Sequence, residues 1–401
     1  MNVLLVTQYF YPENFKSNDL AFELKKRGHE VTVLTGLPNY PEGKLYEGYG
    51  VFSNREQNIK GVRVVRSLLV PRGKGSGFRL FINYYSFAFF ASLKAKRLAR
   101  REKFDAVIVH EPSPITQFYP ALQVKKIQNT PVYFWVLDLW PESLQFAGGI
   151  QNRVILNYYD KLVKRFYSES KKILISSQAF RQSVLEKGDY ERKIEYFPNW
   201  AEDTIADGAT NYPVPQLPEG FKIMFAGNIG EAQDMEAILK AAKKLKKKSE
   251  IKFIILGEGR KMPYLKAFVK EENLENTVLI LGKYPIEAMS SFFNHADLLL
   301  LSLKDDPILN LTVPAKLQAY MAAGKPVVGM LNGEGARTIT EADCGFIVPA
   351  SDACKLAETI EKALYGNPEV LAQKGINGKL YFNDNFTMSS CMDNLERILK
   401  E

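Results

Sequence analysis

A lysine at the start of a short predicted helix is the first sign of a binding site. In the stretch LTVPAKLQAYMAAGKPVV, residues 311–328, a helix is predicted to begin at Pro314 and to break at Gly324 before a strand. Lys316 lies in the first turn, where the helix dipole makes a cation unfavourable. An anion bound at the helix N-terminus reverses that preference. Thr312, Pro314 and Lys316 therefore predict an anion site.

Three more loops in the same half of the chain directly follow predicted strands: GNIG (227–230), GEGR (257–260) and GKYP (282–285). Their glycines let the backbone approach a ligand, and the Arg260 guanidinium suits a phosphate. One such loop is usually only a turn, but four in one domain favour a ligand that carries a diphosphate. The candidate ligands are Gly227, Asn228, Gly230, Gly257, Gly259, Arg260, Lys283, Tyr284, Thr312 and Lys316.

Carboxylates follow a predicted strand in the first half, in VYFWVLDLWPES (132–143). Asp138 comes just after this buried strand, so its side chain is predicted to face a cleft at the sheet edge, where it can act as an acid or base. Glu142 is the second candidate, and Trp140 is a candidate surface for a sugar. The alternative is that Asp138 or Pro141 simply begins the next helix.

The three histidines offer little chemistry. His29 and His295 precede predicted strands and are expected to be structural, whereas His110 ends a strand and, with Glu111, is a candidate near the cleft. No HxH, HExxH or Cys/His spacing predicts a metal site, so no metal is expected. The three cysteines show no CxxC spacing and are expected to be reduced thiols.

The predicted elements that position these residues follow the same alternation of strands and helices in both halves of the chain. At 401 residues, two domains are expected. Strands and helices alternate from the N-terminus, where MNVLLVTQYFYPEN reads as a first strand and not as a signal peptide. The alternation restarts after the Pro-rich stretch 197–220, so two doubly wound α/β domains are predicted, with a ligand site in the cleft between them. The predicted strands are residues 3–7, 30–35, 62–66, 106–109, 132–136, 173–176, 222–226, 252–256, 277–281, 297–301, 326–330 and 346–348.

The net positive charge indicates which classes of partner the protein could bind. A formal net charge of +8 fits an acidic substrate, an anionic membrane or nucleic acid. The charge is dispersed and no RNA-binding motif is present, so nucleic acid is not expected. The helical stretch 77–104 is rich in Phe and Tyr and then turns cationic. Two interpretations stay open: a helix lying on an anionic membrane, or a core helix with a solvated basic end.

Together these motifs resemble a known family. The segments QYFYPENF, LKKRGHEVTVLTGLPNYPEG, DLWPES, FPNWAED, FAGNIGEAQDMEAILKAA, LGEGR and PAKLQAYMAAGKPVV, spread over nearly the whole chain, resemble glycosyltransferase family 4 of GT-B fold. Within it, the chain is most similar to bacterial O-antigen and capsule enzymes of the N-acetyl-L-fucosamine transferase type. The resemblance implies an acceptor domain (1–197), a linker (198–220), a nucleotide-sugar domain (221–384) and a C-terminal helix (385–401) that crosses back to the first domain.

The resemblance also implies partners. A UDP-sugar is the expected donor, no metal cofactor is expected, and the acceptor is a saccharide on undecaprenyl diphosphate. The enzyme would then work in the cytoplasm on the inner face of the cell membrane, which the segment between Phe78 and Lys103 would contact. The expected catalytic residues are Asp138 and Glu142, and the expected acceptor contacts are Glu13, Asn14, His110, Glu111 and Trp140.

The chain departs from the family pattern in the donor half and at one position before Asp138. The two glutamates of the usual E-x7-E motif are Leu311 and Ala319 here, and the usual arginine after the first strand is Asn228. The usual histidine of the first domain is Leu137. Arg260 and Lys316, with the backbone at Gly230, are therefore the expected phosphate partners. Two other functions stay open: a UDP-sugar 2-epimerase, or a degenerate GT-B protein that binds a partner.

Overall fold

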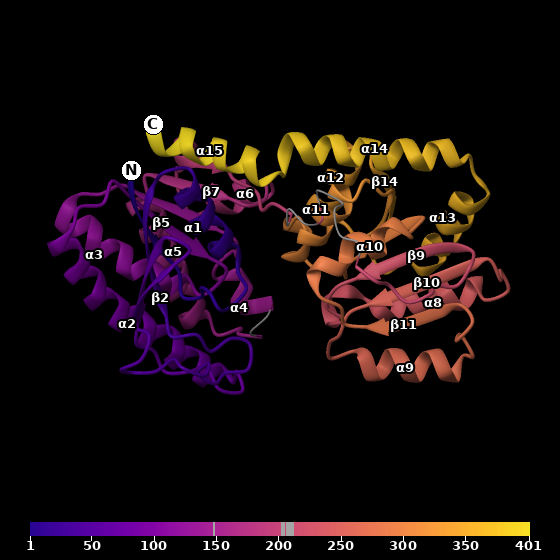
Figure 1. The fold of residues 1–401 in the computed structure, drawn as a ribbon, viewed down its shortest axis with the longest axis horizontal. Coiled ribbons are helices and arrows are strands. Elements are labelled where there is room, and N and C mark those ends of the chain that lie inside the picture. Colours follow the sequence, from indigo (N-terminus) through magenta and orange to yellow (C-terminus); the bar gives the residue numbers. More distant parts are fainter. Residues whose placement is uncertain (147–148, 202–204, 206–211) are drawn as a thin grey trace. The chain divides into compact units, whose positions relative to one another are not determined.

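The computed structural model describes residues 1–146, 149–201, 205 and 212–401. The chain divides into two compact units (Figure 1). The first contains Met1–Phe197 and Met392–Glu401, and the second contains Pro198–Cys391. Each unit is built around one mainly parallel sheet, as the alternation of strands and helices predicted.

The sheet of the first unit has the strand order β3-β4-β2-β1-β5-β6-β7-β8 within the described residues. All neighbours are parallel except β3 and β4. The strands are β1 (Asn2–Val6), β2 (Glu30–Gly36), β3 (Glu56–Ile59), β4 (Val62–Ser67), β5 (Ala106–Glu111), β6 (Val132–Val136), β7 (Lys172–Ile175) and β8 (Ile194–Tyr196). The central strands β1, β5 and β6 are buried apolar runs, typical of a parallel sheet covered on both faces.

The register of these central strands brings distant residues to one sheet edge. β1 pairs with β5 from Val3 opposite Ala106, and β5 pairs with β6 as far as Glu111 opposite Val136. The loops that begin at Thr7, at residue 112 and at Leu137 therefore leave the sheet at the same edge. The helices of this unit are α1 (Lys16–Lys26), α2 (Gly77–Arg101), α3 (Tyr119–Gln128), α4 (Glu142–Phe146), α5 (Arg153–Glu169) and α6 (Phe180–Leu185).

The long helix α2 packs beside α3 (Figure 1). Its aromatic side chains are divided between core and surface: Phe87 is fully buried, whereas Phe78 and Phe89 are exposed. Within the described residues, no helix combines the length and the apolar character needed to cross a bilayer.

The sheet of the second unit has the order β11-β10-β9-β12-β13-β14, with every described pair parallel. Its strands are β9 (Phe221–Ala226), β10 (Ile251–Leu256), β11 (Val278–Gly282), β12 (Leu298–Ser302), β13 (Val327–Met330) and β14 (Gly345–Val348). Its helices are α8 (Met235–Leu245), α9 (Met262–Glu271), α10 (Met289–Asn294), α11 (Ala315–Ala322), α12 (Gly333–Glu341), α13 (Ala353–Tyr365) and α14 (Pro368–Asn385).

Alternate residues of β9 show that both faces of this sheet are covered. Phe225 belongs to a core cluster with α8, α9 and α13, whereas Met224 belongs to a second cluster with α10, α11 and Phe382 of α14. The described part of the predicted linker joins the second cluster, where Ala201 and Ile205 are buried. Residues 202–204 and 206–211 of that linker lie outside the described residues.

The last helix, α15 (Met388–Lys400), contributes its residues from Met392 onward to the first unit. Arg27 donates a hydrogen bond to Asp393 at 2.5 Å, and His29 Nε2 lies 3.1 Å from Oε1 of Glu396. The Tyr133 hydroxyl donates to the backbone oxygen of Leu399 at 3.3 Å. His29 is thus a structural contact, as expected.

Each predicted strand is present with bounds shifted by at most two residues. β3 and β8 were not predicted.

Candidate functional site

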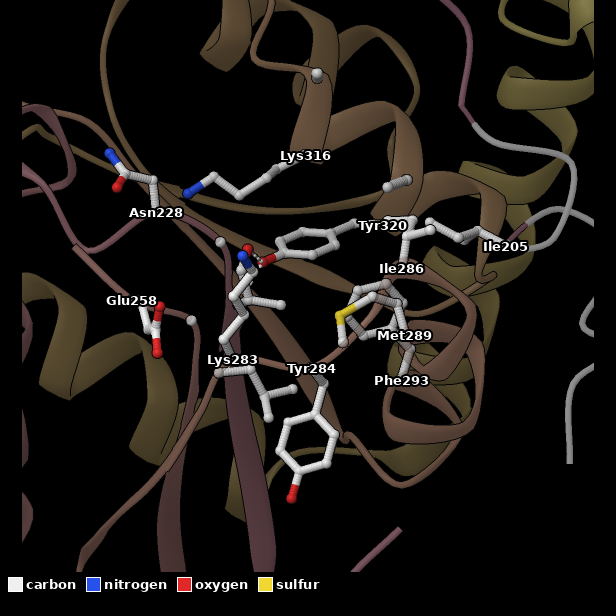
Figure 2. Close-up of a pocket in the computed structure, with 16 residues that line it drawn as sticks. Ile205, Asn228, Glu258, Lys283, Tyr284, Ile286, Met289, Phe293, Lys316 and Tyr320 are labelled. Atoms are coloured by element: carbon white, nitrogen blue, oxygen red, sulfur yellow. Dashed lines mark hydrogen bonds between the residues drawn. The ribbon is translucent and has the colours of Figure 1, made fainter. Parts of the chain in front are cut away.

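The second unit contains a cavity of about 480 Å³ at the carboxyl ends of its strands (Figure 2). The loops after β9, β10 and β11 form one side, and the first turns of α11 form another. This is the edge where ligands bind in open α/β sheets. The position follows from the parallel strand order, because each of these strands ends at the same edge.

Two glycine loops form the floor by direct backbone contact. Gly257 has φ +136°, and a Cβ atom there would lie 1.8 Å from the backbone oxygen of Gly227. Gly227 has φ +146°, and a Cβ atom there would lie 2.9 Å from Cδ of Lys316. Only glycine fits both positions, because any side chain would separate the loops or displace the lysine.

Lys316 is the central cation of this cavity. It is the second residue of α11, and its Nζ atom is buried without a hydrogen-bond partner in the described part of the chain. The ammonium lies over the Phe225 ring, 4.1 Å from the ring centroid, which is a cation–π contact. Burial lowers the pKa of Lys316 to about 7. A buried cation without a counter-charge is costly, so the site favours an anionic ligand.

The structure brings six of the ten predicted anion-site residues together around the cavity: Gly227, Asn228, Gly257, Lys283, Tyr284 and Lys316. Figure 2 shows Lys316, Asn228 and Lys283 near one another. The lysine in the first turn of a short helix was therefore a useful signal, because its side chain does line a cavity.

The other four do not line it. Gly230 lines a separate small cavity, and Gly259 packs against the backbone oxygen of Ile229. The Thr312 hydroxyl donates to the backbone oxygen of Leu309 at 2.9 Å, and Arg260 is exposed. Arg260 had the residue type expected of a phosphate ligand, but its loop position places it outside the lining.

Several lining residues were not predicted. Tyr320, one turn after Lys316, accepts a hydrogen bond from the backbone N–H of Ala226 at 3.0 Å and so joins α11 to β9. Glu258 is a carboxylate at the rim, and Ala319 lies where the family pattern has a glutamate. The spacing 316 to 320 on one helix face was an available signal for Tyr320. The apolar wall consists of Ile205, Ile286, Met289 and Phe293.

In the first unit, Ser113 joins the predicted residues at the ends of β5 and β6. Its hydroxyl donates to Oδ2 of Asp138 at 2.6 Å and accepts from Trp140 Nε1 at 3.1 Å. Its backbone N–H donates to Oε1 of Glu111 at 3.2 Å. Ser113 has φ +79° and was not predicted; no sequence signal distinguished it.

Burial affects both carboxyl groups of this cluster, Asp138 and Glu111. Burial raises the pKa of Asp138, and the hydrogen bond from Ser113 opposes that rise. Burial also raises the pKa of Glu111 well above its usual value, and the charge of Asp138 adds to the effect. Asp138 is half-buried, whereas Glu111 is fully buried. Asp138 is therefore the more accessible carboxyl of the pair, while Glu111 is an internal group.

Glu142 has a different environment. It begins α4, and its Oε1 accepts from Lys187 Nζ at 2.8 Å, while Lys187 also contacts Asp160 at 3.0 Å. Trp140 is 4% exposed and packs against Tyr159, with ring centroids 5.1 Å apart. The sequence did not anticipate that Trp140 is a packing residue; an indole next to a loop carboxylate looks the same whether it is buried or exposed.

The remaining predicted acceptor residues are mostly internal. His110 is buried beside Trp135, its Nδ1 lies 3.3 Å from the Thr7 hydroxyl, and burial lowers its pKa to about 3. The buried Glu13 carboxylate accepts from the backbone N–H of Asn39 at 2.8 Å and of Tyr40 at 2.7 Å. Burial raises the pKa of Glu13 to about 7. Asn14 is exposed.

Metal-ligating side chains do not gather anywhere in the described ranges: no group of three or more His, Cys, Asp or Glu residues is placed to hold an ion.

Comparison with known families matches both halves of the chain. Residues 220–365 match the model described as glycosyl transferases group 1, and residues 18–203 match the model of glycosyltransferase family 4. The chain is 24% identical over 265 residues to WcaI of Escherichia coli (strain K12), named as a colanic acid biosynthesis glycosyl transferase, covering 63% of this chain and 64% of the relative. It is 24% identical to the amylovoran biosynthesis glycosyltransferase AmsK of Erwinia amylovora, covering 63% and 62%. The chain thus spans less than two thirds of the length of these relatives.

Solved structures share the fold over the whole chain. A trehalose-phosphate synthase from Burkholderia vietnamiensis has a TM-score of 0.74 at 12% identity, with 100% of both chains covered. Sucrose-phosphate synthase from Thermosynechococcus elongatus has a TM-score of 0.73 at 15% identity, covering 99% and 98%. Anabaena Alr3699/HepE in complex with UDP has a TM-score of 0.69 at 12% identity, covering 100% of both. These similarities confirm the predicted α/β fold of GT-B type.

Proposed function

Since the chain belongs to glycosyltransferase family 4, we propose that it transfers a sugar from a UDP-sugar to a saccharide acceptor carried on a membrane lipid, undecaprenyl diphosphate. The proposed donor sugar is an N-acetylated deoxyhexosamine such as N-acetyl-L-fucosamine. The proposed product belongs to the synthesis of a capsule or O-antigen polysaccharide. Support for this setting comes from the relatives named for colanic acid and amylovoran biosynthesis.

One observation supports the proposed donor: the Nζ atom of Lys316 in the cavity of the second unit is buried and has no hydrogen-bond partner among the residues that the structure describes. The diphosphate of a UDP-sugar supplies the missing negative charge. The apolar wall around Met289 and Phe293 suits a flat base. The HepE structure, which contains UDP on the same fold, supports the choice of nucleotide.

The positive charge of Lys316 would also stabilise the transition state of sugar transfer. Departure of UDP builds negative charge on the leaving phosphate while the sugar gains positive charge. Lys316 is held in place by Phe225 and by its position beside Gly227, so little reorganisation is needed when that charge develops. Lys283, at the other side of the cavity, is a second candidate cation. No metal cofactor is part of the proposal.

The acceptor half rests on Asp138. A general base must be ionised and within reach of the hydroxyl that it activates. Asp138 has a raised pKa, no cation bonded to it in the described residues, and a hydroxyl donor in Ser113 that orients it. Glu142 remains the second candidate, although Lys187 already neutralises its charge.

The proposed contact with the membrane is based on the exposed residues of helix α2. Phe78 is 76% exposed and Phe89 is 61% exposed, and the last turns of the same helix carry exposed Arg100 and Arg101. Aromatic side chains enter the interface of a bilayer and cations bind anionic headgroups. We therefore place the enzyme on the inner face of the cell membrane, in contact through the segment between Phe78 and Lys103.

Calorimetric titration with UDP tests the donor site. The wild type is expected to bind UDP and to ignore GDP and NAD. Lys316→Ala and Lys316→Met should weaken UDP binding about 10- to 100-fold, since each removes a buried charge-assisted bond. The methionine variant keeps an unbranched apolar side chain against Phe225, so any loss of UDP affinity in this variant measures the effect of removing the positive charge.

The control is Lys240→Ala, which removes an exposed lysine that pairs with Glu236 on α8. Its UDP affinity should equal that of the wild type. Wild-type protein without UDP affinity would contradict the proposed donor, and equal affinity in the Lys316 variants would show that other residues hold the diphosphate.

A further inference from the structure

A second cavity lies in the first unit, on the flank of α2. It has a volume of about 280 Å³ and is lined by Arg55, Ser67, Leu68, Phe90, Leu93, Lys94 and Arg97. Phe90, Leu93, Lys94 and Arg97 are spaced at i, i+3, i+4 and i+7, so they form one strip along the helix. The opposite side comes from Arg55, just before β3, and from the end of β4.

Three cations converge on this small space with little negative charge to balance them. Lys94 Nζ lies 3.8 Å from Glu56, and that carboxylate also contacts Arg63 at 3.4 Å. Among the described residues, Arg55 donates hydrogen bonds to two backbone oxygens, those of Arg66 at 3.0 Å and Val51 at 2.9 Å, and to no carboxylate. Arg97 forms no ion pair within the described part of the chain. No carboxylate lines the cavity.

The electrostatics of Lys94 agree with this imbalance. Burial lowers its pKa, Glu56 opposes that shift, and the nearby Arg55, Arg97 and Arg63 lower it further. Arginine neighbours outnumber the single carboxylate, so a bound anion would relieve their mutual repulsion. An anion small enough for this cavity would therefore bind favourably, and Arg97 presents the planar guanidinium that suits a phosphate.

Apolar side chains flank the same opening. Leu93 is 50% exposed and Phe90 is 37% exposed, and both line the cavity. Phe89 contacts Phe90 at a ring-centroid distance of 5.2 Å and extends the exposed apolar surface along α2. A freely soluble phosphate or sugar phosphate has no apolar part for these side chains to contact. A lipid has both the phosphate and the chains.

We propose that the cavity between α2 and the β3–β4 hairpin binds the phosphate of an anionic membrane phospholipid, with Lys94 and Arg97 as its ligands and Phe89, Phe90 and Leu93 in the adjoining lipid surface. The inference rests on the membrane partner of the proposed function and is independent of the UDP site. According to this proposal, α2 does not only attract an anionic membrane through its overall positive charge, but also forms a site with defined residues for one lipid headgroup.

Co-sedimentation of the full chain with lipid vesicles tests the site. The probes are phosphatidylcholine vesicles with and without phosphatidylglycerol, at low and at physiological salt. The test variant is Lys94→Gln with Arg97→Gln. The matched control is Lys96→Gln with Arg100→Gln, which removes the same charge from exposed positions of the same helix outside the cavity. Thermal unfolding of each variant shows that it is folded.

Diffuse attraction to an anionic surface contributes about fivefold in partition coefficient for each cation, so the control pair should lose this much per residue. The cavity pair should lose at least about tenfold more, because it also loses charge-assisted bonds to the phosphate. Equal losses in the two pairs would overturn the headgroup site and leave a diffuse membrane contact. Wild-type protein that ignores phosphatidylglycerol vesicles would overturn both, while the UDP titration would be unaffected.

Discussion

The ammonium of Lys316 lies 4.1 Å from the centroid of the Phe225 ring and has no hydrogen-bond partner among the described residues. The aromatic ring is thus the only group in the described structure that offsets this buried charge. The arrangement keeps the cation in position while leaving its hydrogen-bonding capacity for a ligand. The pH dependence of UDP binding and the stability of the unliganded protein should both depend on this contact, and the integrity of the cavity should depend on the glycine loops beside Lys316.

The affinity for UDP should depend on pH through Lys316. The pKa of this lysine is lowered to about 7, so the free protein loses the charge as the pH rises above that value. A bound diphosphate favours the charged form, and the affinity is therefore highest below about pH 7 and falls toward pH 9. Calorimetric titration from pH 7 to pH 9 should show this fall in the wild type. Lys316→Met should show a flat profile, and a parallel fall in both would assign the effect to another group.

The same residue should lower the stability of the unliganded protein. A lysine with its pKa depressed by folding destabilises the native state below its unfolded pKa, and the cost disappears only as the pH rises toward that unfolded value. Lys316→Met should therefore raise Tm at pH 7 by about 2–4 °C for each kcal/mol recovered, and by less at higher pH. Differential scanning calorimetry without UDP measures both. A lower Tm in the variant at pH 7 would contradict the cost of the buried charge.

Gly257→Ala should disrupt the donor cavity. The new Cβ would lie 1.8 Å from the Gly227 backbone oxygen, and φ of +136° is unfavourable for alanine. We expect destabilisation of about 1–3 kcal/mol and loss of UDP binding, measured by urea unfolding and calorimetry. Gly50→Ala is the control, because nothing lies within 4 Å of its Cβ position and its φ is not in the left-handed region. Normal UDP binding by Gly257→Ala would show that the loops can separate without damage to the site.

Asp138→Asn should lower kcat by about 10²- to 10⁴-fold if Asp138 is the general base. Ser113→Ala tests the arrangement in a different way, because the Ser113 hydrogen bond lowers the pKa of Asp138 and its removal raises that pKa further. Activity that needs the ionised carboxylate is lost as the pH falls, so the acidic limb of the kcat profile should move to higher pH in Ser113→Ala. An unshifted limb would argue against Asp138 as the titrating base.

Glu142 and Lys187 form a pair whose role can be measured by a double-mutant cycle. The ion pair of 2.8 Å is partly shielded from solvent, and Glu142→Gln should leave Lys187 with Asp160, at 3.0 Å, as its remaining carboxylate partner. Urea unfolding of Glu142→Gln, Lys187→Met and the double variant should reveal coupling of about 0.5–3 kcal/mol. Additive losses of stability together with a large fall in kcat for Glu142→Gln would instead assign Glu142 to catalysis.

The sheets were predictable because their strands carry the strongest signal in the sequence. Runs such as VLLV at β1 and FIIL at β10 are long enough and apolar enough to mark buried parallel strands. β3 has the sequence EQNI and an exposed edge position, so it has no apolar pattern to detect. Its pairing is set by the tight turn at Lys60 and Gly61, which both have positive φ.

The cavity could be predicted only in part. Lys316 and the glycine loops were found because residue type and strand-end position agreed. Arg260 had the right type, but only Gly257 and Glu258 of its loop line the cavity, whereas Arg260 is exposed outside the lining. Met289 and Phe293 look like ordinary core residues, because an apolar side chain beside a cavity has the same helical spacing as one inside a core.

The assignment of Met392–Glu401 to the first unit has a consequence for how the chain is made. During synthesis, the first unit lacks its last helix until the whole second unit has left the ribosome, whereas the second unit, Pro198–Cys391, is one continuous segment. The contacts of Asp393 with Arg27 and of Glu396 with His29 can form only after residues 198–391 have been synthesised. A chain that stops between residues 391 and 392 would therefore contain the whole second unit, while its first unit would lack the contacts that residues 392–401 supply.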